Sequence, residues 1–265
     1  MSDGYHLKYI SLGAGLQSTC LLMMACTGDN GCGPADVAIF ADVAGDEPAW
    51  VYETLEWCKK NSSIPIEVVS KASLSKQIAD KKAGKPGRVA MPPLFMEHGG
   101  FTRRQCTREL KIEVIEKRVR EIMGYEPRQR IKEKAQAWLG ISLDEAHRMK
   151  PSRQPWINNR WPLIDARMRS SDCVRYMEEK GWPVPGKSSC VFCPYHSDRY
   201  YRELRDNHPG EFARAVAFDD MVREMPGLDE KAYVHRSLRP LSEIKFEHED
   251  QIELFGEECS GHCGI

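Results

Sequence analysis

The sequence lacks a long apolar run and an excess of charge of one sign. Its 265 residues include 38 Lys and Arg against 39 Asp and Glu, so the formal net charge is −1 at pH 7. No stretch approaches the roughly 18 apolar residues that cross a bilayer, and Met1 to Gly4 show no basic flank of a signal peptide. These absences argue against a membrane partner and against a protein that coats nucleic acid by bulk charge. We therefore expect a cytoplasmic protein.

Ten cysteines are the unusual part of an otherwise ordinary composition. In a small secreted domain they would predict disulfides, but this chain is long and shows no export signal. A reducing compartment leaves metal ligation, redox catalysis and core packing as their roles.

The order of secondary-structure patterns predicts an α/β fold. Five apolar runs predict strands, at residues 5–12, 37–42, 64–70, 135–141 and 161–164. Helical patterns alternate with them, at residues 19–25, 47–60, 108–123 and 171–181. This alternation predicts a doubly wound, mainly parallel five-stranded sheet, which is a Rossmann-like fold. We expect this domain to span 1–185 and a helical or irregular extension to span 186–265. Gly, Pro and Lys between 81 and 93 predict a mobile loop over a site.

A glycine-containing turn joins the first predicted strand to the first predicted helix. Its members are Gly13, Ala14, Gly15, Leu16, Gln17, Ser18 and Thr19. Small residues let the backbone close around an anion, and the free N–H groups of a helix start would bind it. The alternative is a tight turn whose glycines serve geometry alone. No Gly-Lys-Ser/Thr and no complete Gly-x-Gly-x-x-Gly fingerprint is present, so the turn is neither a Walker loop nor a dinucleotide loop.

The turn resembles the PP-loop (Ser-Gly-Gly-x-Asp-Ser) of the adenine-nucleotide α-hydrolase-like superfamily. Gly13 stands for the first Ser and Gln17 for the Asp, which is similar to the variant loop of phosphoadenosine phosphosulfate (PAPS) reductases. Further motifs of that family follow in its order, between residues 5 and 194: Phe40-Ala41-Asp42, Cys106-x-Arg108-x-x-Lys111, Gly140-Ile141 with Arg148, and Cys190-x-x-Cys193. The resemblance implies that the non-cysteine residues of these motifs, with Ser11, bind ATP or a sulfonucleotide (PAPS or APS), with Mg²⁺ as a candidate companion.

The cysteines of these motifs are candidates for a metal centre. Cys190 and Cys193 form a pair that can bind a metal or act as a redox dithiol. Cys106 precedes a basic helix start, which would stabilise a thiolate. The resemblance implies that the three hold a 4Fe-4S cluster, with zinc as the alternative. Iron–sulfur reductases carry two adjacent cysteines where this chain has one, so the fourth position is either open or taken by one of Cys173, Cys259 and Cys263.

The end of the chain carries two further cysteines. Glu258-Cys259, with Cys263 after it, resembles the Glu-Cys-Gly tail of sulfonucleotide reductases. In that family the tail cysteine attacks the sulfate sulfur, and a thioredoxin-like reductant completes the reaction. Cys259 and Cys263 are therefore candidate catalytic residues or structural ligands. Three other cysteines lie in predicted helices among apolar residues and are expected in the core: Cys20, Cys26 and Cys58.

Three functions follow from these features. The first is a PAPS reductase-like enzyme with redox or sulfur-transfer chemistry on an activated nucleotide, favoured by Gln17 and the tail cysteines. The second is a PP-loop ATP pyrophosphatase that adenylates an acceptor for thiolation, favoured by Ser142, where reductases carry Arg, and by the single Cys106. The third is a non-catalytic nucleotide-binding subunit, because proteins resembling this family occur in phages and beside CRISPR systems, with nucleic acid or a CRISPR complex as partner. The sequence leaves the oligomeric state open.

Overall fold

A five-stranded parallel sheet forms the centre of the protein. The computed structural model describes residues 4–246. The strands of this sheet are β1 (Leu7–Leu12), β2 (Val37–Asp42), β3 (Ile66–Ser70), β5 (Ala135–Leu139) and β6 (Ile157–Arg160). They lie in the order β3-β2-β1-β5-β6, and each neighbouring pair is parallel. Because β1 is central, residues at its carboxyl end lie between the ends of β2 and β5.

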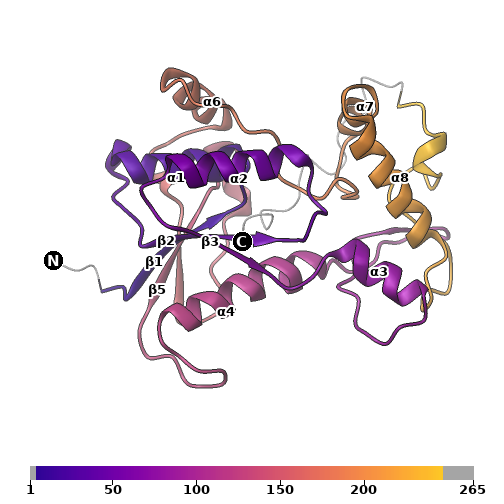
Figure 1. The fold of residues 1–265 in the computed structure, drawn as a ribbon, viewed down its shortest axis with the longest axis horizontal. Coiled ribbons are helices and arrows are strands. Elements are labelled where there is room, and N and C mark those ends of the chain that lie inside the picture. The colour runs from indigo at the N-terminus through magenta and orange to yellow at the C-terminus, as the bar shows by residue number, and fades with distance from the viewer. Residues whose placement is uncertain (1–3, 247–265) are drawn as a thin grey trace.

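Helices cover both faces of the sheet, so the predicted doubly wound α/β fold is confirmed (Figure 1). Alternate residues of β1 point to opposite faces: Ile10 packs in one core and Tyr9 in the other. The first face carries α1 (Leu16–Thr27), α2 (Ala49–Asn61), α5 (Pro162–Asp165) and α6 (Ser170–Glu179), and the second carries α4 (Glu113–Ile122).

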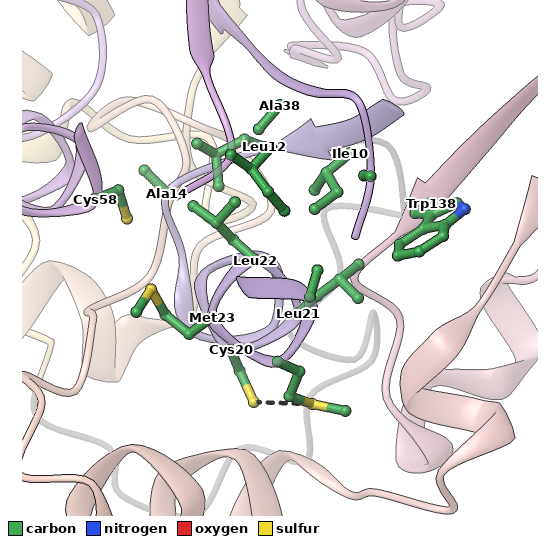
Figure 2. Packing of buried hydrophobic residues seen from close by; sticks show 14 of the residues in the cluster. Ile10, Leu12, Ala14, Cys20, Leu21, Leu22, Met23, Ala38, Cys58 and Trp138 are labelled. Atoms are coloured by element: carbon green, nitrogen blue, oxygen red, sulfur yellow. Dashed lines mark hydrogen bonds between the residues drawn. The ribbon is translucent and has the colours of Figure 1, made fainter. Parts of the chain in front are cut away.

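Helix α1 is enclosed by its neighbours, and it carries buried side chains around most of its circumference. Ile10 and Leu12 of β1 pack against Leu21 and Leu22 of the helix, and Trp138 of β5 lies beside them (Figure 2). Leu21 and Leu22 are fully buried, and each such side chain contributes about 1.5–3 kcal/mol relative to exposure. This packing fixes the start of α1, and with it the glycine turn, against the central strand.

A third core lies beyond the sheet, where α7 (Asp198–Asn207) and α8 (Pro209–Arg223) pack with α3 (Leu74–Lys82) (Figure 1). Two short strands, β4 (Phe95–Met96) and β7 (Ala232–Tyr233), pair antiparallel beside them. This core joins residues on both sides of position 185, and the boundary expected there stays a prediction. Within residues 4–246, no helix is long and apolar enough to cross a membrane.

Two local predictions differ from the structure, and one helix was not predicted. The strand expected at 161–164 is helix α5, because Pro162 occupies a first-turn position where no N–H is needed. The fifth strand comes just before it. Residues 83–93 form neither helix nor strand, as expected of the loop. Helix α3 precedes them and was not predicted; Ser73 caps it by accepting a hydrogen bond from the N–H of Lys76. The helix expected from 108 begins with a π-helical turn, Arg108–Ile112.

Candidate functional site

The glycine turn lies at the carboxyl end of β1 and opens α1. Gly15 is the N-cap of the helix, and no side chain caps it. The N–H of Gly13 donates to Ser18 Oγ (3.1 Å), and that hydroxyl donates to the Gly15 carbonyl (3.2 Å). Ala14 has a φ of +52°, in the left-handed region that non-glycine residues rarely adopt. The backbone is therefore held in a tight, strained loop at a helix start, where N–H groups lack intrahelical partners.

Two other segments of the chain lie in close contact with this turn. A Cβ placed on Gly140, just after β5, would lie 2.7 Å from the Ser18 nitrogen and 2.9 Å from the Gln17 carbonyl carbon. A Cβ on Gly15 would lie 2.5 Å from Ser188 Oγ. Glycine is thus required at Gly140, where the contact is with backbone, and at Gly15 a side chain would have to displace the Ser188 hydroxyl. The structure brings Gly140 to the turn, as the motif order implied.

The side chains of the turn point largely into the protein. Thr19 is fully buried, and its hydroxyl meets the thiol of Cys58 at 4.0 Å. The Gln17 amide donates to Ser170 Oγ at 3.2 Å, and Leu16 packs against the first core. Ser11, below the turn, is also buried. The turn consequently offers backbone N–H groups to a ligand rather than the Thr19 hydroxyl.

The end of β2 combines core residues with one carboxylate. Phe40 is 1% exposed, and its ring meets Tyr52 edge-on with centroids 6.4 Å apart. Ala41 is buried on the opposite face of the sheet. The Asp42 carboxylate accepts from the Tyr52 hydroxyl (3.0 Å) and from the N–H of Ala44 (2.8 Å). Phe40 therefore acts by fixing the strand end and not through an exposed ring.

The segment after β5 holds the other predicted nucleotide residues. Ile141 is buried. Arg148 forms an ion pair with Glu145, and its Nε is buried with no hydrogen-bond partner among the described atoms. Ser142 Oγ lies 3.1 Å from Ser170 Oγ, the same hydroxyl that accepts from Gln17. A chain of polar side chains thus links this segment to the turn.

Three of the predicted ligands line one small cavity of about 40 Å³: Cys106, Cys190 and Cys193. Its walls include apolar side chains such as Leu74 and Phe192, and the cations Arg104 and Lys111 also reach it. Within residues 4–246, no three His, Cys, Asp or Glu side chains form a group that could hold a single metal ion. The cysteines therefore surround one space without converging on one point.

A buried ion pair lies beside these thiols. Lys111 Nζ is 2.6 Å from Glu47 Oε1, and the two side chains are 9% and 0% exposed. Burial lowers the pKa of Lys111, but Glu47 and the nearby thiols raise it more, so the pKa of this ammonium lies above its ordinary value. Burial also raises the pKa of Cys190 well above its usual range, against the opposing effect of Lys111. A permanent positive charge therefore faces the cysteine cavity.

The Cys190–Cys193 segment is fastened to the sheet edge at several points. The N–H of Val191 donates to the Asp46 carbonyl (3.0 Å), and the Trp50 indole donates to the Lys187 carbonyl (3.1 Å). His196 Nε2 lies 2.9 Å from the Cys190 carbonyl. Burial lowers the pKa of His196 well below its ordinary value, so the neutral ring donates this hydrogen bond. The segment thus contacts both the loop after β2 and, through Ser188, the glycine turn.

The remaining cysteines divide as follows. Cys20 and Cys58 are fully buried, as expected for core residues, and Cys26 is half-buried. Cys173 lies next to Cys20 in the core between α1 and α6, and this neighbouring thiol, together with burial, raises the pKa of Cys20. Cys173 is therefore not brought to the cysteine cavity. Two candidates, Cys259 and Cys263, lie outside the described residues.

Two residues of the site were not predicted from the sequence. Glu47 precedes Pro48, which indicates a helix start, and nothing local marks it as the partner of Lys111. Ser188 stands two residues before Cys190, and only the folded chain shows that it meets Gly15.

Comparison of the sequence with protein-family models gives no match, and comparison with curated proteins gives none. Among solved structures, the chain is similar to phosphoadenylyl-sulfate (PAPS) reductase from Candida auris in its phosphate complex. The two share 12% sequence identity with a TM-score of 0.40, over 68% of this chain and 75% of the other. Similarity at this level says nothing of the chemistry of this chain.

Proposed function

We propose that this chain is an enzyme that binds an adenine nucleotide at the glycine turn and performs redox or sulfur-transfer chemistry on it, as a PAPS reductase-like protein. One observation carries the proposal. The segment that bears Cys190 and Cys193 lies against the turn, where a Cβ on Gly15 would meet Ser188 Oγ at 2.5 Å. A phosphate bound at the turn would therefore lie near thiol groups.

The turn has the features of a phosphate site. Helix α1 starts without a side-chain cap, and N–H groups at such a start bind anions through their partial positive charge. Gly140 allows the end of β5 to approach the turn closely, so the ends of β2 and β5 would flank a nucleotide held there. This arrangement agrees with the general rule that ligands bind at the carboxyl ends of parallel strands.

The cysteine cavity fits an iron–sulfur cluster by the chemistry of its donors. In a cluster, separate irons take separate thiolates, whereas a zinc ion needs its ligands gathered on one centre. Within residues 4–246 the three thiols line one space but form no such gathered group, so the 4Fe-4S proposal rests on the Cys106 and Cys190-x-x-Cys193 motifs and on this shared space. Cys106, Cys190 and Cys193 would hold the cluster, and Cys259 or Cys263 stays the proposed fourth ligand or the nucleophile. A bound cluster supplies electron transfer or an iron site for sulfur.

Lys111 is the residue best suited to work between the two parts. Its ammonium is buried, paired with Glu47, and faces both Cys190 and Cys106. A fixed positive charge in a water-poor site stabilises thiolates and the oxygens of a phosphate or sulfate group. Glu47 keeps the ammonium in place, and so acts as a positioning residue.

The test is a product assay on anaerobically purified protein. We expect brown colour, iron and acid-labile sulfide, together with sulfite release from PAPS in the presence of a dithiol reductant. Cys193→Ser should remove the colour and the activity, whereas Cys26→Ser, which packs against the core around α1, should keep both. A colourless protein that releases no sulfite from PAPS would contradict the proposal.

The same assay separates the two alternatives. Release of pyrophosphate from ATP without sulfite from PAPS would identify an ATP pyrophosphatase, for which the buried Ser142 in place of the reductase Arg is the supporting observation. Nucleotide binding without either product would identify an accessory subunit.

A further inference from the structure

A cavity of about 760 Å³ lies beside α4, on the face of the sheet opposite α1. Its floor is formed by β1 and β6 and its sides by residues before α4 and by the loop 150–154. Of the proposed nucleotide residues, Ser11 and Arg108 reach it, while the turn from 13 to 19 does not. The cavity therefore adjoins the nucleotide site and shares Ser11 and Arg108 with it, while its other side chains are its own.

Cations dominate its lining, which includes Arg88, Arg103, Arg104, Arg108, Lys150 and Arg153 against the carboxylates Glu109, Glu113 and Glu116. Two of the arginines are neutralised: Arg88 pairs with Glu109 and Arg108 with Glu113, both through contacts of 2.9 Å.

Three other cations are not held by a salt bridge among the described residues. The side chains of Arg103, Lys150 and Arg153 are exposed and make no hydrogen bond or ion pair with any residue from 4 to 246. Arginine and lysine side chains in such an arrangement bind phosphate oxygens through charge-assisted hydrogen bonds.

The floor of the cavity carries a polar group without a partner. Tyr9 is 4% exposed, lines the cavity, and its hydroxyl makes no hydrogen bond with the described residues. Beside it, Glu116 accepts a hydrogen bond from the Gln154 amide at 2.8 Å. Burial raises the pKa of both Tyr9 and Glu116, which favours their protonated, hydrogen-bond-donating forms. This hydroxyl is reached from the cavity and shares its proton with none of the described residues, so a ligand group there can accept a hydrogen bond from it.

We propose that this cavity binds a phosphate ester with a polar body, as a second ligand beside the nucleotide. The phosphate would lie among Arg103, Lys150 and Arg153, and a hydroxyl or carbonyl of the body would pair with Tyr9. The volume lies within the roughly 300–1,000 Å³ of small-molecule sites. That this ligand lies beside a bound nucleotide rests on the proposed function, whereas its binding does not.

The test uses ribose 5-phosphate as the probe and calorimetric titration of the full-length protein. We expect saturable binding in the absence of nucleotide and equally in the presence of a non-hydrolysable ATP analogue, and much weaker binding of ribose. Lys150→Gln and Arg153→Gln should each weaken the probe about 10-fold, because each removes a charge-assisted hydrogen bond. Lys117→Gln is the matched control, since this exposed lysine lies on α4 but does not line the cavity.

Tyr9→Phe tests the floor without disturbing the fold, because the hydroxyl it removes bonds to no residue from 4 to 246. We expect several-fold weaker probe binding with an unchanged melting temperature. The proposal is overturned if ribose 5-phosphate does not bind at millimolar concentration, if the ATP analogue displaces it, or if the cavity variants bind it like Lys117→Gln. The probe is titrated without nucleotide. A failure of nucleotide binding would therefore contradict the proposed function but not this inference.

Discussion

Removing one partner of the Lys111–Glu47 pair should destabilise the protein strongly. The pair is 2.6 Å long and its side chains are 9% and 0% exposed, and Glu47 Oε2 already lacks a hydrogen-bond partner among the described atoms. Lys111→Met leaves a carboxylate buried without its counter-charge, which costs about 3–5 kcal/mol. For a chain of this size each kcal/mol lowers the melting temperature by roughly 2–4 °C, so we expect a drop of about 6–20 °C.

The double variant separates charge from packing. Replacing both partners, as Lys111→Met with Glu47→Met, removes the unpaired charge and keeps the volume, so most of the lost stability should return. The assay is thermal unfolding followed by circular dichroism at neutral pH and moderate salt, with Lys117→Met as an exposed-lysine control. The reasoning is refuted if Lys111→Met melts within 2 °C of the control, an interval of about 1 kcal/mol or less, or if the double variant is no more stable than the single.

Three further outcomes are expected. Gly140→Ala forces a Cβ against the turn backbone at 2.7 Å, so it should cost about 1–3 kcal/mol and abolish nucleotide binding; Gly210→Ala, which meets nothing within 4 Å, should do neither, and equal behaviour of the two would contradict this. Burial lowers the pKa of His235 although Asp198 opposes the shift. The unfolded chain therefore takes up a proton near pH 6.5 and the folded chain only at lower pH, so stability should fall as pH drops below about 6.5; urea unfolding of His235→Gln across pH 5–8 should show a flatter profile. Iron content should fall in Cys106→Ser and stay unchanged in Cys26→Ser, as measured by elemental analysis.

The sheet could be predicted because its strands are short apolar runs that the fold buries on both faces. β2 and β5 illustrate this, since nearly every residue in them is apolar or small. Helix α3 was missed because it is short and mostly polar, with Leu74 and Ile78 as its buried residues. β6 has one buried residue, Ile157, so its sequence shows little hydrophobic alternation, and the apolar residues that follow it carry the stronger strand pattern.

The site could be predicted only in part, because its contacts join distant parts of the chain. The motifs grouped Gly140 with the turn, as nucleotide residues, and Cys106 with Cys190, as metal ligands. The structure places the members of each group near one another. Spacing could not decide that Cys173 packs in a different core, because a cysteine in a helix reads the same in either place. Glu47 and Lys111 are 64 positions apart, and no local pattern announces such a pair.

Hydrogen–deuterium exchange with and without saturating ATP or PAPS tests the central claim most directly. If an adenine nucleotide binds at the glycine turn with the CxxC segment against it, amides of residues 13–19 should exchange more slowly, and exchange in 186–193 should change with them. Unchanged exchange in both segments under either nucleotide would contradict the claim.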